Sequence, residues 1–167
     1  MHPWNRHILF MSFLPAAGWV VKVADVTPVN PGNELVYGSR YNKKIMISYP
    51  NGSGGHHREV LFQGVLGDEL RAGNMWDIAI GDVLPDRPGN EIVGVDDDGF
   101  VYLLWREGDQ WRNDIIYDDT NALYAVDVGD FLPDTPGMEI VVGGMSKTVR
   151  MLSAKPSSSV EGWRMYE

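Results

Sequence analysis

The chain contains no cysteine among its 167 residues, which excludes disulfides, thiol catalysis and cysteine-based zinc or iron–sulfur sites. It also has no apolar run long enough to span a membrane. Basic residues are few, 14 Lys and Arg against 23 Asp and Glu, and the net charge of −9 argues against a nucleic-acid partner. The sequence motifs of serine hydrolases, phosphate-binding loops, dinucleotide-binding folds and zinc proteases are missing as well. The sequence therefore shows none of the common catalytic signatures.

The chain contains one sequence motif three times, at residues 19–36, 76–93 and 124–141. Each copy runs from an aromatic residue through alternating aliphatic residues to a small residue and an Asp. A Pro follows the Asp by three positions, Pro-Gly by six and seven, and a Glu by nine. The repeated aspartates, Asp25, Asp82 and Asp130, are 57 and 48 positions apart. This spacing is typical of propeller blades and other stacked units.

Each unit divides into four short segments with the period-two alternation that favours β-strands over helices. The first segments are 19–24, 76–81 and 124–129, and the second are 34–37, 91–95 and 139–143. The third are 44–49, 100–105 and 148–153, and the fourth are 58–63, 112–117 and a start at 163. Asp98-Gly99 favours a two-residue hairpin turn between the second and third segments of the middle unit. The sequence predicts an all-β chain of β-propeller blades, each a four-stranded antiparallel unit.

One stretch of the middle unit carries a family resemblance. It runs from Gly81-Asp82 through Glu91-Ile92-Val93-Gly94 to Asp98-Gly99-Phe100-Val101-Tyr102. This stretch resembles the FG-GAP and VCBS repeats of integrin-type β-propellers, and the likeness extends from about Trp4 to Trp163. The resemblance implies the fold, and it favours an extracellular or periplasmic location. It does not identify a function, because such blades serve very different proteins.

The number of repeats predicts a partner. We expect one repeat domain with units at about 12–63, 64–117 and 118–167, and with an N-terminal strand at 4–11 completing a blade. Propellers close with four to eight blades, so three units need completion from outside the chain. Two alternatives stay open: a homodimer that forms a six-bladed ring, each chain lending an outer strand across the seam, or a segment of a longer propeller.

The Asp-rich turns are candidate sites for a divalent cation. In the calcium loops of FG-GAP and VCBS blades, carboxylates at alternate positions surround the ion, which prefers six to eight oxygens. The matching oxygen donors in the second and third units are Asp82, Asp86, Glu91, Asp130, Asp134 and Glu139. The third position of the loop is Leu84 or Leu132, which cannot bind metal. The resemblance thus predicts weak Ca²⁺ sites, and the structural alternative is that Asp caps the turn through backbone amides while Glu starts the next strand.

Four further residues are candidates for ligand binding. The first strands of propeller blades face the ring axis, and Lys22, Asp77 and Asp127 are the charged positions of those strands that differ between units. Variation among repeats marks the positions where function is grafted onto a scaffold. Trp105 ends a third strand, where we expect an exposed aromatic on which a sugar ring could stack. Trp19, Trp76 and Tyr124 share one repeat position, which indicates packing between blades.

These observations predict a non-catalytic β-propeller module that recognises a protein or a carbohydrate through its loops or central channel. The alternative is a metal-dependent, lyase-like sugar-processing enzyme with its site in the channel. One further segment, Glu59-Val60-Leu61-Phe62-Gln63-Gly64, is similar to the recognition site of a picornaviral protease. It falls where the outer strand of the first unit is expected, so we interpret it as that strand.

Overall fold

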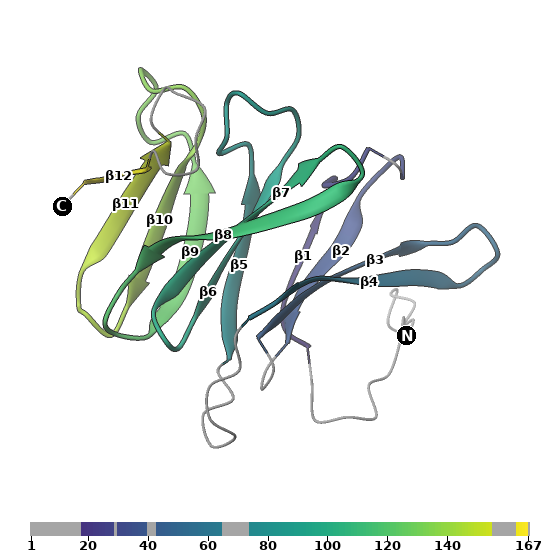
Figure 1. The fold of residues 1–167 in the computed structure, drawn as a ribbon, viewed down its shortest axis with the longest axis horizontal. Helices are drawn as coiled ribbons and strands as arrows, with labels where there is room; N and C mark the ends of the chain where they lie inside the picture. Colours follow the sequence, from purple (N-terminus) through teal and green to yellow (C-terminus); the bar gives the residue numbers. More distant parts are fainter. Residues whose placement is uncertain (1–17, 29, 40–42, 65–73, 155–162, 167) are drawn as a thin grey trace, which may run out of the picture.

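The structure is a computed structural model that describes residues 18–28, 30–39, 43–64, 74–154 and 163–166. The described residues form twelve β-strands and no helix, arranged as three four-stranded antiparallel sheets (Figure 1). The first sheet contains β1 (Gly18–Ala24), β2 (Glu34–Ser39), β3 (Lys44–Pro50) and β4 (His56–Gln63). The second contains β5 (Met75–Gly81), β6 (Glu91–Asp96), β7 (Phe100–Glu107) and β8 (Gln110–Asp118). The third contains β9 (Leu123–Gly129), β10 (Glu139–Gly144), β11 (Val149–Ala154) and β12 (Trp163–Tyr166). The all-β prediction is confirmed.

Each sheet follows chain order, so that every strand pairs with the next one along the sequence. In the third sheet β12 pairs with β11 and supplies the fourth strand. The strand predicted at residues 4–11 lies outside the described residues. All three sheets have four strands within residues 18–166. The loan of an outer strand across the seam between two chains stays a prediction.

The three sheets stack face to face, with β5 of the second sheet in contact with β1 of the first and β9 of the third (Figure 1). One hydrophobic core lies between the first and second sheets and includes Val36, Ile45 and Ile78. A second core lies between the second and third sheets and includes Leu103 and Ile140. Since successive side chains of a strand point to opposite faces, the middle sheet contributes to both cores.

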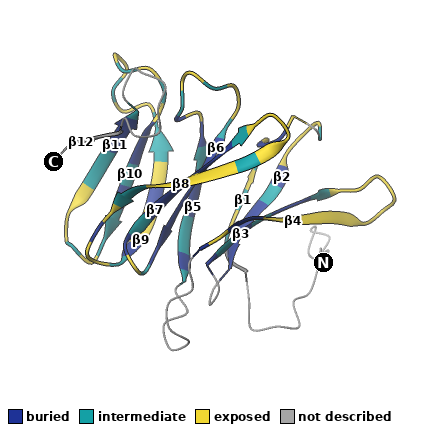
Figure 2. Ribbon diagram, viewed as in Figure 1, coloured by how far each residue is buried: buried dark blue, intermediate teal, exposed yellow. Residues whose placement is uncertain are grey.

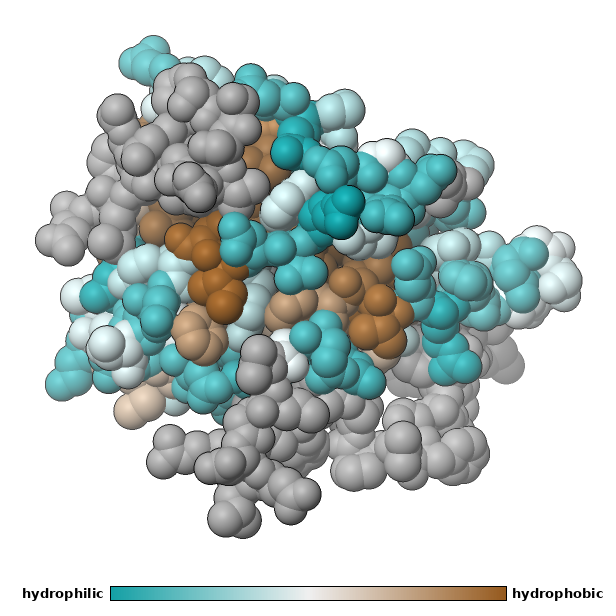
Figure 3. All heavy atoms as spheres, in the orientation of Figure 1, coloured by the Kyte–Doolittle hydropathy of each residue, from teal (hydrophilic) through white to brown (hydrophobic). Residues whose placement is uncertain are grey.

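Burial therefore differs sharply among the strands. Every residue of β6 is buried, whereas β4 and β8 at the outer edges of their sheets are largely exposed (Figure 2). The face seen in Figure 3 is hydrophilic over most of its described area, and apolar side chains reach it in separate patches. The periodic aliphatic residues of the repeats are thus used mainly to pack one sheet on the next.

The turns match the residues that form them. The connection between β6 and β7 consists of Asp97, Asp98 and Gly99, and Gly99 has the positive φ of +94°. This is a three-residue hairpin loop with Gly in the left-handed position, one residue longer than predicted. Lys43 and Lys147 have the equivalent positive φ values of 46° and 60° just before β3 and β11. A side chain in this conformation is uncommon, so the turn holds each lysine at some cost in strain.

The repeated aromatic position behaves as a packing position. The rings of Trp76 on β5 and Tyr124 on β9 are 5.2 Å apart in an edge-to-face arrangement. Such pairs stabilise a contact beyond the area that they bury. The interpretation of this position as packing between neighbouring blades is confirmed for the second and third units.

Candidate functional site

The repeated turn is organised by its Glu, not by its Asp. Glu34, Glu91 and Glu139 are all buried, at 0–2% exposure. Oε2 of Glu91 accepts hydrogen bonds from the backbone amides of Val83 and Leu84, at 3.0 and 3.1 Å. Oε2 of Glu139 likewise accepts from the amides of Phe131 and Leu132, and Oε2 of Glu34 accepts from the amide of Val26. One carboxylate in each turn therefore accepts hydrogen bonds from the loop amides. The amides of Val83 and Phe131 also donate to the carbonyl oxygens of Gly81 and Gly129, both at 3.1 Å.

The aspartates of the turn lie differently. Asp82 and Asp130 are exposed, and within the described part of the chain their side chains accept no hydrogen bond. The expectation that Asp caps the turn is corrected: the buried Glu does so, because it lies at the base of the loop with its carboxylate toward the loop amides. Burial raises the pKa of Glu91 to about 7, against the lowering effect of the two amide hydrogen bonds.

This arrangement does not match a calcium loop. Asp86 and Asp134 are exposed, and Glu91 and Glu139 use one oxygen each on backbone amides. Over residues 18–154 with their gaps and 163–166, no group of three or more His, Cys, Asp or Glu side chains could hold a metal ion. Ca²⁺ binding at the turns stays a prediction from the sequence. Calorimetric titration of Ca²⁺ into chelator-treated protein tests it.

The three charged residues predicted to face a ligand come together in one hollow. Lys22, Asp77 and Asp127 line a cavity of about 460 Å³, together with residues of β9, β10 and β11. Nζ of Lys22 lies 3.6 Å from Oδ1 of Asp77, and Oδ2 of Asp77 accepts a hydrogen bond from the amide of Val126 at 3.2 Å. Asp127 is exposed beside them. We call this cavity the inner-strand hollow, since β1, β5 and β9 each contribute one charged side chain.

The inner-strand hollow presents both signs of charge to solvent. The side chains of Lys22 and Asp77 are 40% and 24% exposed, so both can still contact a ligand. One ammonium and two carboxylates at the rim can bind a polar molecule by hydrogen bonds and charge. The sequence places these residues on separate units, and the stacking of the sheets brings them together.

Trp105 does not lie on the surface. Its side chain is 8% exposed and belongs to the core between the second and third sheets. Val101, Leu103 and Trp105 alternate along β7 and point to the same face, which the third sheet covers. The guanidinium of Arg87 lies over the Trp105 ring, 5.4 Å from its centroid. The prediction of an exposed aromatic here was wrong.

The sequence reasoning missed a buried ionic cluster at the junction of the first and second sheets. Lys43 and Asp96 are 1% and 0% exposed, and Nζ of Lys43 contacts carboxylates of both Asp96 and Asp98. Asp96 also accepts a hydrogen bond from the Tyr102 hydroxyl at 2.7 Å. Burial alone would lower the pKa of Lys43, but the hydrogen bonds that its ammonium donates to the Asp98 and Asp96 carboxylates raise it. Burial and the adjacent Asp96 carboxylate raise the pKa of Tyr102.

Compared with known proteins, the chain matches no family model and none of the curated proteins. The resemblance to FG-GAP and VCBS repeats therefore depends on the sequence motifs alone. None of the described residues forms a helix that is long and apolar enough to cross a membrane.

Proposed function

We propose that this chain is a non-catalytic β-propeller module, in which two copies form a six-bladed ring that recognises a protein or a carbohydrate. One observation carries the proposal: positions that are buried in the middle sheet are exposed on the outward faces of the first and third sheets. Both end sheets thus have an outward apolar face that no sheet among the described residues covers.

The first sheet shows this on β1. Val21 lies four positions before the repeated Asp, as do Ile78 and Val126 in the other two units. Ile78 and Val126 are 0% and 4% exposed, whereas Val21 is 58% exposed. Val23, on the same face of β1, is 66% exposed. We call this outward face of the first sheet the leading face.

The third sheet shows the same on β11. Val149 lies ten positions after the turn Glu, as does Val101 in the middle unit. Val101 is 0% exposed because the third sheet covers it, whereas Val149 is 75% exposed. Val149 pairs with Gly143, so it points away from the core formed by Ile140 and Val142. We call this outward face of the third sheet the trailing face.

Within the chain, the face of one sheet that contains Val101 packs on the face of the next that contains Val126. The trailing face of one copy is equivalent to the face that contains Val101. The leading face of another copy is equivalent to the face that contains Val126. Two copies related by a two-fold axis would satisfy both faces at once, and closed rings of this kind are common in homo-oligomers. Six blades lie within the range over which propellers close. Further blades of a longer propeller would cover the same two faces. The mass measurement described in the Discussion distinguishes this alternative from the ring of two copies.

In such a ring the inner-strand hollow lies beside the central channel, where Lys22, Asp77 and Asp127 would contact the ligand. The test is to screen the purified protein on an array of glycans and against a panel of divalent metals. We expect retention of at least one ligand by the wild type and its loss in the double variant Lys22→Ala/Asp127→Ala. A ligand that the double variant retains at full strength would exclude the hollow as the binding site. Metal-dependent turnover of a glycan would instead support the lyase-like alternative.

A further inference from the structure

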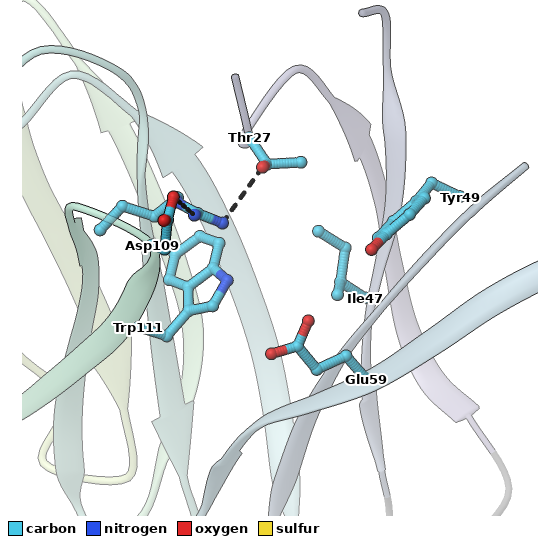
Figure 4. A pocket seen from close by; sticks show the side chains of 7 residues that line it. Thr27, Ile47, Tyr49, Glu59, Asp109 and Trp111 are labelled. Carbon is cyan, nitrogen blue, oxygen red and sulfur yellow. Dashed lines mark hydrogen bonds and ion pairs between the residues drawn. The ribbon is translucent and has the colours of Figure 1, made fainter. Parts of the chain in front are cut away.

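A second cavity lies between the first and second sheets, away from the inner strands. Its first wall consists of Thr27, Ile47, Tyr49 and Glu59, and its second wall consists of Arg106, Asp109 and Trp111. The cavity has a volume of about 190 Å³ (Figure 4). We call it the intersheet groove. It shares no lining residue with the inner-strand hollow.

The groove is built around Arg106, whose side chain is 15% exposed. Its Nη1 donates a hydrogen bond to Oγ1 of Thr27 at 3.2 Å, across the junction between the two sheets. Its Nε and Nη2 donate to the carbonyl oxygen of Gly108 at 3.4 and 3.3 Å, and Nη2 lies 3.8 Å from Oδ1 of Asp109. These contacts hold the guanidinium in one orientation. Since a guanidinium has five N–H donors, two of them donate no hydrogen bond to the described residues.

Two aromatic rings flank the cavity. Trp111 is half-buried on β8, and the Arg106 guanidinium lies 5.7 Å from the centroid of its ring. Tyr49 is half-buried on β3, is held against His57, and in Figure 4 points its hydroxyl toward the gap. Aromatic faces carry partial negative charge, so they attract the partly positive C–H groups of a saturated ring.

Glu59 completes the groove from β4. Its carboxylate points across the cavity toward Trp111 in Figure 4. Within the described part of the chain, Glu59 makes no hydrogen bond and no ion pair. The groove therefore has the Glu59 carboxylate on its first wall and the Arg106 guanidinium, with the Asp109 carboxylate, on its second, and the aromatic rings lie beside them.

This set of groups selects the class of ligand. A simple anion would meet the carboxylates of Glu59 and Asp109, and a simple cation would meet the guanidinium of Arg106. A neutral ring with several hydroxyl groups avoids both repulsions, because each hydroxyl can donate to Glu59 or accept from Arg106. Its C–H face can pack on Trp111 or Tyr49. We infer that the intersheet groove is a binding site for one sugar unit of a neutral glycan, held by Trp111, Arg106 and Glu59.

This inference deepens the proposed function, because it rests on the role of the chain as a binding module and names a site that needs no second copy. It also replaces the sugar-stacking role expected at Trp105. Trp111 is a tryptophan that the fold leaves half-buried beside polar groups.

The experiment uses the same array of neutral and acidic glycans, followed by calorimetric titration of the glycan that is retained. The variants are Trp111→Ala and Glu59→Gln, and the matched control is Asp118→Asn on β8, an exposed carboxylate outside the groove. We expect a neutral glycan to bind the wild type and Asp118→Asn equally. Loss of a hydrogen bond to a charged group should weaken binding to Glu59→Gln about tenfold, and Trp111→Ala should abolish it.

Three results would overturn the inference: retention of no neutral glycan, retention only of acidic glycans, or equal affinity for the wild type and Glu59→Gln. Glu59 is exposed, so Glu59→Gln keeps the test valid even where Trp111→Ala lowers the stability of the fold. Loss of binding in Lys22→Ala/Asp127→Ala with full binding in Glu59→Gln would overturn this inference while supporting the proposed function. Binding that depends on Glu59 in a protein of monomeric mass would support the groove while contradicting the six-bladed ring.

Discussion

The ammonium of Lys43 lies 2.9 Å from Oδ2 of Asp96, and both side chains are buried between the first and second sheets. Lys43 precedes β3, and Asp96 ends β6, so this ion pair joins the first and second sheets. Asp96 uses its other oxygen, Oδ1, to accept hydrogen bonds from the amides of Asp98 and Phe100, both at 3.0 Å. This ion pair therefore fixes the position of the first sheet against the β6–β7 turn of the second sheet.

Removing one partner of this pair should be costly. We expect Lys43→Ala to lower the free energy of unfolding by about 3 kcal/mol, because it leaves the Asp96 carboxylate buried without its cation. The control is Lys44→Ala, which changes the neighbouring, partly exposed lysine and should cost less than about 0.5 kcal/mol. Urea denaturation measures both. Equal losses in the two variants would show that the pair does not hold the sheets together.

The repeated turn should depend on its Glu more than on its Asp. Glu139→Ala leaves the amide of Leu132 without its acceptor and the amide of Phe131 with only the carbonyl oxygen of Gly129, and should cost about 2 kcal/mol of stability. Asp130→Ala changes an exposed side chain in the same turn and should alter stability by less than about 0.5 kcal/mol. Thermal and urea unfolding of the two variants test this. A larger loss in Asp130→Ala would restore the Asp cap expected from the sequence.

Stability should fall with rising pH because of Glu91. Its pKa is about 7 in the folded protein, against an ordinary value of 4.5, so the folded state holds more protons than the unfolded state between these values. Protonation of Glu91 therefore stabilises the folded state fully below about pH 4.5. This contribution to the free energy of unfolding, about 3 kcal/mol at most, is lost as the pH rises through 7. Glu91→Gln cannot titrate and should lack this component. The measurement is the difference in unfolding free energy between wild type and Glu91→Gln from pH 4.5 to 8, and a constant difference would contradict the expectation.

The protease-like segment gives a probe of β4. The bond after Gln63 lies at the end of β4, where Phe62 is 8% exposed and the amide of Gly64 donates to the carbonyl of Lys43 at 3.0 Å. We expect the folded wild type to resist the picornaviral protease. A chain unfolded in urea and then diluted should be cut after Gln63 until it has refolded. Lys43→Ala should be cut faster than Lys44→Ala. Rapid cleavage of the folded wild type would show that β4 is not held in the sheet.

Local patterns were enough to predict the strands. Alternating residues such as Val126 and Val128, and turn residues such as Gly99, act within a few positions of the chain, so their effect can be inferred from the sequence alone. The common hollow for Lys22, Asp77 and Asp127 followed from the same logic, because equivalent positions of stacked repeats lie at equivalent places.

Features that depend on contacts between sheets could not be predicted in this way. The burial of Trp105 depends on which face of β7 the third sheet covers. The pairing of Lys43 with Asp96 joins residues of different repeats that no periodic pattern relates. The intersheet groove likewise takes Glu59 from one sheet and Trp111 from another, and no repeat pattern relates these two residues to each other.

The outward faces should control association. Val149→Asp places a charge on the trailing face and should prevent two copies from joining, since an unpaired charge is costly to bury. Ile115→Asp is the matched control, because Ile115 is also exposed, at 47%, but lies on β8 outside both outward faces. We expect Ile115→Asp to associate like the wild type. Equal association of both variants would exclude the trailing face from the contact.

The molar mass of the wild-type chain in solution tests the six-bladed ring most directly. Sedimentation equilibrium at micromolar concentration should give twice the chain mass of 18.7 kDa, and the chain mass itself for Val149→Asp. A wild-type mass of 18.7 kDa throughout the concentration range would contradict the ring of two copies.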